Sequence, residues 1–275
     1  MKKIIVPVDF TDVSKTALKY AMDFAAAIGS ELSILHLVED RKDAIDREEK
    51  LVAFAQELGL KEPSQVKFLV VAGSIFTDIA KIAEVEKADL IVMGTHGIKG
   101  LQLIRGSHAL RIIRECTVPV IIVQENNSCT AYPDGILVPL DLHKDTKQKL
   151  KIAADFSEQF NAVAHVISPN ETDEYLNNTI NRNLSYAVNY LEERGVAFEA
   201  SITEEDSGDF VKGLVRYAVE KGVDLICILN NTNETFFHAF GLESEQKIIT
   251  NDAGIPVLIM NPAAAMVDSS SVFAQ

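Results

Sequence analysis

Cysteine is scarce in this sequence of 275 residues, which contains only Cys116, Cys129 and Cys227. The three are far apart, odd in number and without the spacing of metal ligands. This pattern argues against a disulfide framework and against a thiolate zinc site. It indicates reduced thiols, and we therefore expect a cytoplasmic protein.

Long hydrophobic runs are also absent. No apolar stretch approaches the roughly 20 residues that a membrane-spanning helix needs. The first residues, Met1-Lys2-Lys3, lead at once into a strand-like segment, so we expect no signal peptide and no membrane association. Apolar residues still make up 47% of the chain, which is enough for one large or two medium hydrophobic cores.

Basic residues are in the minority, because 26 Lys and Arg face 40 Asp and Glu, for a formal net charge of -14. This balance argues against a general nucleic-acid partner. It leaves room for a local anion site, since backbone amides can form one inside an acidic protein. The sequence contains neither a P-loop nor a Gly-x-Ser-x-Gly nucleophile motif.

Short β-branched runs alternate with amphipathic segments along the first half of the chain. The runs predict strands at residues 2–8, 31–38, 66–71, 88–93 and 118–123, and the segments between them predict helices at residues 11–28, 43–58, 73–85 and 107–116. Thr11 or Asp12 is the expected cap of the first helix. The alternation predicts an α/β fold with a doubly wound parallel sheet.

The same pattern then starts again. Residues 136–141, 164–167, 223–226 and 255–259 restate residues 4–9, 35–38, 88–91 and 118–122 in the same order. Four ordered matches indicate an internal duplication. We predict a first domain over residues 1–125, a polar linker over 126–133, a second domain over 134–262 and a frayed tail over 263–275.

A glycine-rich segment follows the fourth expected strand. Residues 93–107 read Met-Gly-Thr-His-Gly-Ile-Lys-Gly-Leu-Gln-Leu-Ile-Arg-Gly-Ser, and helical spacing follows. A loop of this kind between a strand and a helix N-terminus is a common phosphate site, because free N–H groups and the helix dipole face the anion. Glycines that simply turn the chain are the alternative. The hydroxyl and imidazole groups in the loop, with Lys99 and Arg105, favour phosphate.

The second copy lacks this loop. Residues 228–232 read Ile-Leu-Asn-Asn-Thr where residues 93–97 read Met-Gly-Thr-His-Gly, and Phe236, Phe237 and Phe240 follow. Side chains with Cβ atoms and rings would fill a cradle built for phosphate. We therefore expect one ligand for each chain rather than two.

Several polar residues outside the loop have two candidate roles, one in ligand binding and one in the fold. Asp9 follows the first strand, where it can bind ribose hydroxyls or cap the next helix, and the two roles can coexist. Asp141 has the same placement in the second copy, where a structural role is favoured. His36 and His165 lie on apolar strands and are expected to be hydrogen-bonded structural histidines. His96 and His108 flank the loop but make a poor zinc signature, so no metal is expected on side chains alone.

These motifs together resemble the universal stress protein family, in a tandem form with two domains. The motifs are Val-Pro-Val-Asp at residues 6–9, Leu-His-Leu-Val at 35–38, Ala-Asp-Leu-Ile-Val-Met-Gly-Thr-His-Gly at 88–97, Gly-Ser at 106–107 and Val-Pro-Val-Ile-Ile-Val at 118–123. The resemblance implies a five-stranded parallel sheet of order 3-2-1-4-5 in each half. It also implies ATP or a related adenine nucleotide at the strand ends, with magnesium on the phosphates.

The resemblance also implies roles for individual residues. The acidic residue of the first strand contacts the nucleoside, a backbone group at the end of the second strand meets adenine, and the glycines and the closing Gly-Ser lie against ribose and phosphates. The predicted nucleotide-binding residues are Pro7, Asp9, Val38, Gly94, Thr95, His96, Gly97, Gly106, Ser107 and His108. One feature departs from the family pattern, because eight residues instead of nine separate Gly97 from Gly106.

Three functions follow as hypotheses. The first is a nucleotide-binding stress-response protein that is not an enzyme beyond slow ATP hydrolysis, because the loop offers no obvious general base. The second is a protein-interaction module that binds no nucleotide. The third is an adenylate-transferring enzyme, for which no extra catalytic element is visible. The two Val- and Ile-rich fifth strands are expected to pair edge to edge, making the chain a pseudo-dimer; a homodimer and protein partners are further expectations.

Overall fold

The computed structural model describes residues 1–40, 42, 44–62, 65–74, 78–95, 112–113, 115–140, 142, 147–230 and 247–261. The first half of the chain contains β1 (Lys3–Pro7), α1 (Asp12–Ile28), β2 (Glu31–Val38), α2 (Ala44–Glu57), β3 (Val66–Ala72), α3 (Ile79–Val85), β4 (Leu90–Thr95) and β5 (Val120–Gln124). The second half contains β6 (Gly135–Pro139), α6 (Gln148–Phe160), β7 (Val163–Ser168), α7 (Glu174–Glu193), β8 (Phe198–Ile202), α8 (Phe210–Lys221), β9 (Leu225–Leu229) and β10 (Val257–Met260).

The sheet order confirms the predicted α/β fold. The strands run β3-β2-β1-β4-β5-β10-β9-β6-β7-β8, so each half has the order 3-2-1-4-5. All pairs within a half are parallel. The buried faces of the strands account for this arrangement, since their runs of Ile, Val and Leu are covered on both sides, as parallel sheets require.

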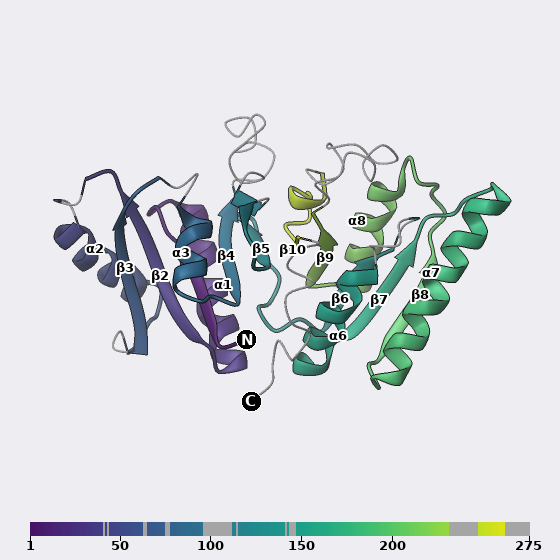
Figure 1. The fold of residues 1–275 in the computed structure, drawn as a ribbon, viewed down its shortest axis with the longest axis horizontal. Helices are drawn as coiled ribbons and strands as arrows, with labels where there is room; N and C mark the ends of the chain where they lie inside the picture. Colours follow the sequence, from purple (N-terminus) through teal and green to yellow (C-terminus); the bar gives the residue numbers. More distant parts are fainter. Residues whose placement is uncertain are drawn as a thin grey trace.

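Helices cover both faces of the sheet (Figure 1). One core cluster packs α1, α2, α6 and α7 on one face, through residues such as Phe24 and Phe156. The other packs α3, α8 and the segment around Ile112 on the opposite face. The first helix begins where the sequence predicts, because the Thr11 hydroxyl accepts a hydrogen bond from the Ser14 amide.

The two halves join through their fifth strands, as expected, and this makes one ten-stranded sheet. β5 and β10 pair antiparallel, with Ile121 opposite Leu258. These two residues hold the same place in the two copies, two residues after Pro119 and Pro256, so the halves are related by an approximate twofold. Phe24 and Phe156, each four residues before the last residue of its helix, meet there with ring centroids 5.7 Å apart.

Two sequence-based assignments are wrong, one in where a strand ends and one in how the two copies align. β4 runs on to Thr95, so Gly94 and Thr95 belong to a strand and pair with Val123 and Gln124. In the second copy, the ladder places Ile167 beside Pro139 as it places Leu35 beside Pro7. His36 therefore corresponds to Ser168, and His165 corresponds to Ser33. The sequence comparison aligned these short apolar motifs by their composition, three residues away from the structural alignment.

No helix among the residues placed by the structure is long and apolar enough to cross a membrane.

Candidate functional site

The candidate site lies where the strand order of the first half reverses. β1 pairs with β2 on one side and with β4 on the other. The chain leaves β1 toward β2 through α1, and it reaches β4 from β3 through α3. In open α/β sheets, the crevice outside the carboxyl ends of two such strands is the usual ligand site. Of the predicted residues, Pro7, Asp9, Gly94 and Thr95 stand at the ends of these two strands.

Asp9 forms the turn that leads into α1. Its Oδ1 accepts hydrogen bonds from the Thr11 hydroxyl at 2.6 Å and from the Thr11 amide at 3.1 Å. Burial alone would raise the pKa of the Asp9 carboxyl, but the hydrogen bonds from Thr11 and Ser14 outweigh it and hold the pKa below its ordinary value. The side chain is exposed. The cap of α1 is Thr11, so Asp9 holds the turn before the helix rather than capping it, and its carboxylate stays in contact with solvent.

Phe10 begins a cluster of side chains next to this turn that the sequence did not single out. It is not glycine but has a φ of 66°, in the left-handed region. Its ring lies 4.5 Å from the His36 ring and 5.3 Å from the Phe54 ring, measured between centroids. Lys50 Nζ lies 4.2 Å from the Phe10 centroid, which brings a cation to this side of the crevice.

Both strand histidines are hydrogen-bonded, as predicted. His36 Nδ1 lies 2.7 Å from the carbonyl oxygen of Val8, so this nitrogen is the donor. His165 Nδ1 lies 3.2 Å from the Tyr217 hydroxyl, in a buried position. Burial lowers the pKa of His165, with Glu199 opposing the effect and Lys221 adding to it.

Gly94 is required by packing. A Cβ at this position would lie 2.8 Å from the carbonyl oxygen of Val13 and 2.9 Å from its Cγ2. The first turn of α1 therefore rests directly on the end of β4. The resemblance assigns Gly94 to ribose and phosphate contact, and the structure adds a reason for glycine that holds without a ligand.

Thr95 ends β4 with a polar atom that the fold does not use. Its side chain is 3% exposed, and its Oγ1 has no hydrogen-bond partner among the described residues. Thr95 alternates in β4 with Ile91 and Met93, which pack in the cluster that contains Ile112 and Ile113. The hydroxyl thus points to the layer that contains the end of the helix after the glycine-rich loop. Leaving such a group unsatisfied costs free energy, so it is a natural contact for a polar ligand.

Val38 lies at the end of β2 and is buried. Its carbonyl oxygen accepts a hydrogen bond from the Gly73 amide at 2.9 Å. A carbonyl oxygen has two lone pairs, so this bond leaves one acceptor position open. The other predicted residues, His96, Gly97, Gly106, Ser107 and His108, lie outside the described residues.

The second half has different side chains at the equivalent edge. Leu229 and Asn230 occupy the places of Gly94 and Thr95, because Leu225 pairs beside β6 as Leu90 does beside β1. Leu229 is 3% exposed and belongs to the core. The Asn230 Nδ2 donates to Asn261 Oδ1 at 2.6 Å. A core side chain thus takes the place of Gly94, and the Asn230 amide nitrogen has a hydrogen-bond partner where the Thr95 hydroxyl has none among the described residues.

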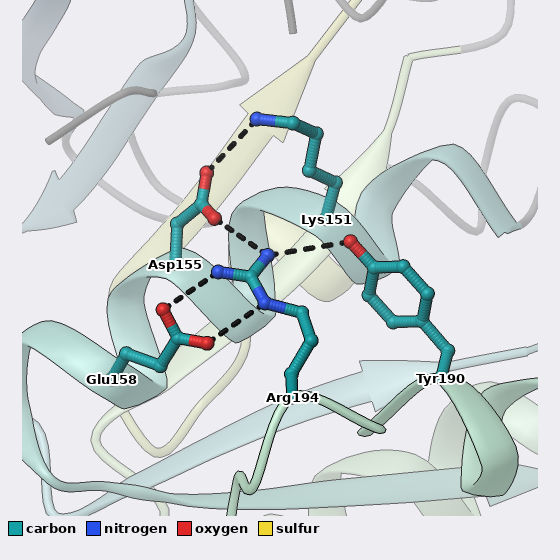
Figure 2. Close-up of polar contacts among 5 residues, drawn as sticks. All are labelled: Lys151, Asp155, Glu158, Tyr190 and Arg194. Carbon is teal, nitrogen blue, oxygen red and sulfur yellow. Dashed lines mark hydrogen bonds and ion pairs between the residues drawn. The ribbon is translucent and has the colours of Figure 1, made fainter. Parts of the chain in front are cut away.

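The second half also has an ion-pair network between α6 and α7, which Figure 2 shows. Arg194 donates to both oxygens of Glu158, at 2.7 and 2.6 Å, and to Asp155 Oδ1 at 2.7 Å. Lys151 Nζ lies 3.2 Å from the other oxygen of Asp155. The Asp155 side chain is only 8% exposed, so this pairing matters for stability. Asp23, at the same place in α1, is exposed.

Metal ligands do not gather at either edge. Within the described part of the chain, no group of three or more His, Cys, Asp and Glu side chains could hold a metal ion. A cation at the first-half edge would therefore need oxygen atoms from a ligand, as magnesium bound to a nucleotide has.

Comparisons with known proteins agree with the fold. The sequence model of the universal stress protein family matches residues 1–124. A universal stress protein of Methanocaldococcus jannaschii is 31% identical over 147 residues, which cover 45% of this chain and 82% of that protein. A second one from the same organism is 27% identical over 161 residues, or 46% of this chain and 97% of that protein.

Among solved structures, a universal stress protein from Archaeoglobus fulgidus superposes with a TM-score of 0.71 at 20% identity. It covers 94% of this chain and 96% of its own, so the likeness in fold spans both halves. The family match lies in the first half, and the doubled sheet accounts for a length about twice that of the single-domain relatives. The chain therefore belongs to the universal stress protein family, with two copies of the fold in tandem.

Proposed function

We propose that the first half binds one adenine nucleotide at the carboxyl edge between β1 and β4, with ATP and magnesium as the ligand that the motifs favour. The observation that carries this proposal is the buried Thr95 hydroxyl, which has no partner among the described residues and lies where β4 leads into the glycine-rich loop. At the equivalent edge of the second half, the Asn230 amide nitrogen donates to Asn261, whereas the Asn230 Oδ1 has no partner among the described residues.

The described groups at this edge fit such a ligand. The exposed Asp9 carboxylate would accept hydrogen bonds from ribose hydroxyls. The open acceptor position of the Val38 carbonyl suits an amino group such as that of adenine. The loop at residues 96–107 would hold the phosphates through its backbone amides.

The chemistry favours binding over catalysis. Asp9 lies just after β1, and hydrogen bonds from Thr11 keep the pKa of its carboxyl below the ordinary value. Such a group accepts hydrogen bonds well but is a weak general base at neutral pH. We therefore propose a nucleotide-responsive binding protein in which ATP hydrolysis is slow at most.

A second candidate, a protein-interaction module without a nucleotide, rests on the loop. Eight residues between Gly97 and Gly106, one fewer than in the family pattern, shorten the loop by up to about 3.5 Å.

For either candidate function, β5 and β10 pair with each other within the chain. A homodimer would therefore need another surface.

Calorimetric titration with ATP and magnesium separates the two candidates. We expect the unmodified chain to bind ATP, and Gly97→Val to lose at least about tenfold in affinity while keeping its fold, because a side chain would occupy the phosphate cradle. Thr232→Val, at the corresponding place in the second half, is the matched control and should bind like the unmodified chain. No heat and no thermal shift at millimolar ATP would overturn the proposal.

A further inference from the structure

The carboxamide of Asn261 crosses from the second half to the first. Asn261 directly follows β10, and its Nδ2 donates to the carbonyl oxygens of Ile113 at 2.6 Å and Cys116 at 2.5 Å. These carbonyls lie at the C-terminal end of the helix that follows the glycine-rich loop. The last carbonyls of a helix have no partner within it. The second half thus adds donors at this helix end, where the Ile113 carbonyl also accepts from the Cys116 amide at 3.3 Å.

Gln124 makes the reciprocal contact. It ends β5 at the place that Asn261 holds after β10, and its Nε2 donates to the carbonyl oxygen of Asn251 at 2.9 Å. Asn251 follows the helical residues 247–249 of the second half. Each half therefore holds the end of one helix of the other half. The two contacts differ in their expected consequence for ligand binding, because only the first-half helix follows an intact Gly-Ser.

The second half also fixes how the Asn261 amide is oriented. Asn230 Nδ2 donates to Asn261 Oδ1 at 2.6 Å, so the Nδ2 of Asn261 must face the first half. Both side chains are buried, with Asn230 1% and Asn261 8% exposed. Asn230 occupies the place of Thr95. Thr95 is the residue proposed to meet a ligand in the first half. Its counterpart in the second half, Asn230, instead orients a hydrogen-bond donor toward the first half.

We propose that Asn261 is a positioning residue for the nucleotide site, holding the base of the helix whose other end meets the phosphates. This inference rests on the proposed function. Fixing one end of a short helix limits the orientations of its N-terminus, and a preorganised site loses less free energy when a ligand orders it. The effect should fall on phosphate binding, because the nucleoside contacts come from β1 and β2.

The test compares ATP with adenosine by calorimetric titration. Asn261→Asp keeps the shape but replaces two donated hydrogen bonds with a carboxylate that faces two carbonyls. We expect the Kd for ATP to rise about five- to tenfold, and the Kd for adenosine to stay within about twofold. Asn230→Ala only frees the Asn261 amide, so it should raise the Kd for ATP by about two- to threefold, and it serves if the first variant does not fold.

Phe160→Ala is the matched control for a general loosening of the junction. The Phe160 ring lies 5.4 Å from that of Phe24 between α6 and α1, away from the helix that Asn261 contacts. This variant should lower stability and leave the ratio of the ATP and adenosine affinities unchanged. A ratio that is also unchanged in both asparagine variants would overturn the positioning role alone. Failure of the unmodified chain to bind ATP would overturn the proposed function, and this role with it.

Discussion

The two halves share a strand order but use the end of the fourth strand differently. In the first half, Gly94 lets α1 rest on β4, and the Thr95 hydroxyl has no partner within the part of the chain that the structure describes. In the second half, Leu229 fills the core and Asn230 bonds to Asn261. The comparison teaches that a duplicated fold can keep its strand order while different side chains occupy the end of the fourth strand in each copy.

The halves also differ in how their helices are held. Asp155 on α6 is buried in a network with Arg194 and Lys151, whereas Asp23 at the same place on α1 is exposed. The second half thus has an ion-pair network between α6 and α7 at a place where the first half has an exposed carboxylate.

Leu229→Ala should have the largest effect on stability. It removes a side chain that is 3% exposed in the core of the second half, so we expect the free energy of unfolding to fall by about 2–4 kcal/mol, as for other large-to-small core changes. Denaturant unfolding measures this. Val219→Ala, at a position 58% exposed, is the control and should change it by less than about 0.5 kcal/mol. Equal effects of the two changes would contradict the packing role of Leu229.

Asp155→Ala should come next, at about 2 kcal/mol, because it leaves Lys151 unpaired and breaks one of the bonds of Arg194 in a buried setting. The equivalent change in the first half, Asp23→Ala, should lie within about 0.5 kcal/mol because that side chain is exposed. The two variants, unfolded under the same conditions, compare the halves directly. A loss as small for Asp155 as for Asp23 would show that the network adds nothing.

Gly94→Ala should destabilise the chain by about 1–2 kcal/mol even without nucleotide, because its Cβ would lie 2.8 Å from the backbone oxygen of Val13. The thermal unfolding temperature of the ligand-free chain reports this. An unchanged temperature would mean that Gly94 serves the ligand alone. This variant is consequently a poor probe of binding, and Gly97→Val is the better one.

The smallest effect concerns pH. Burial lowers the pKa of His165, against the opposing influence of Glu199, so between its folded and unfolded pKa values the unfolded chain binds more protons. Stability from this residue is complete above the unfolded value of about 6.5 and declines as the pH falls below it. His165→Gln, which does not titrate, should lose less stability than the unmodified chain between pH 7.5 and pH 5. Identical slopes would contradict the assignment.

Much of the fold could be predicted from the sequence. Runs of β-branched residues placed the described strands other than β8, and the repeated motifs gave the duplication. The family resemblance gave the pairing of β5 with β10. The end of β4 was misplaced, because glycine usually ends a strand, whereas here it stays in the ladder to admit α1. The correspondence of His36 with His165 failed because short apolar runs match in more than one register.

The candidate site could be predicted only in part. Motif spacing identified Asp9, Gly94 and Thr95, which the fold brings to one edge, but contacts between distant segments carry no local signal. Phe10 with Lys50 and the Arg194 network depend on such contacts. The amide residue at the end of each fifth strand, Gln124 and Asn261, was one visible sign of the crossing contacts. The occurrence of an amide residue at this place in both copies is the sequence feature that points to these contacts.

The stoichiometry of nucleotide binding tests the central claim most directly. Native mass spectrometry of the intact chain with ATP and magnesium counts the bound nucleotides. The asymmetry between the halves predicts one ATP for each chain, lost in Gly97→Val and kept in Thr232→Val. Two ATP molecules on the unmodified chain, or one that persists in Gly97→Val, would contradict it.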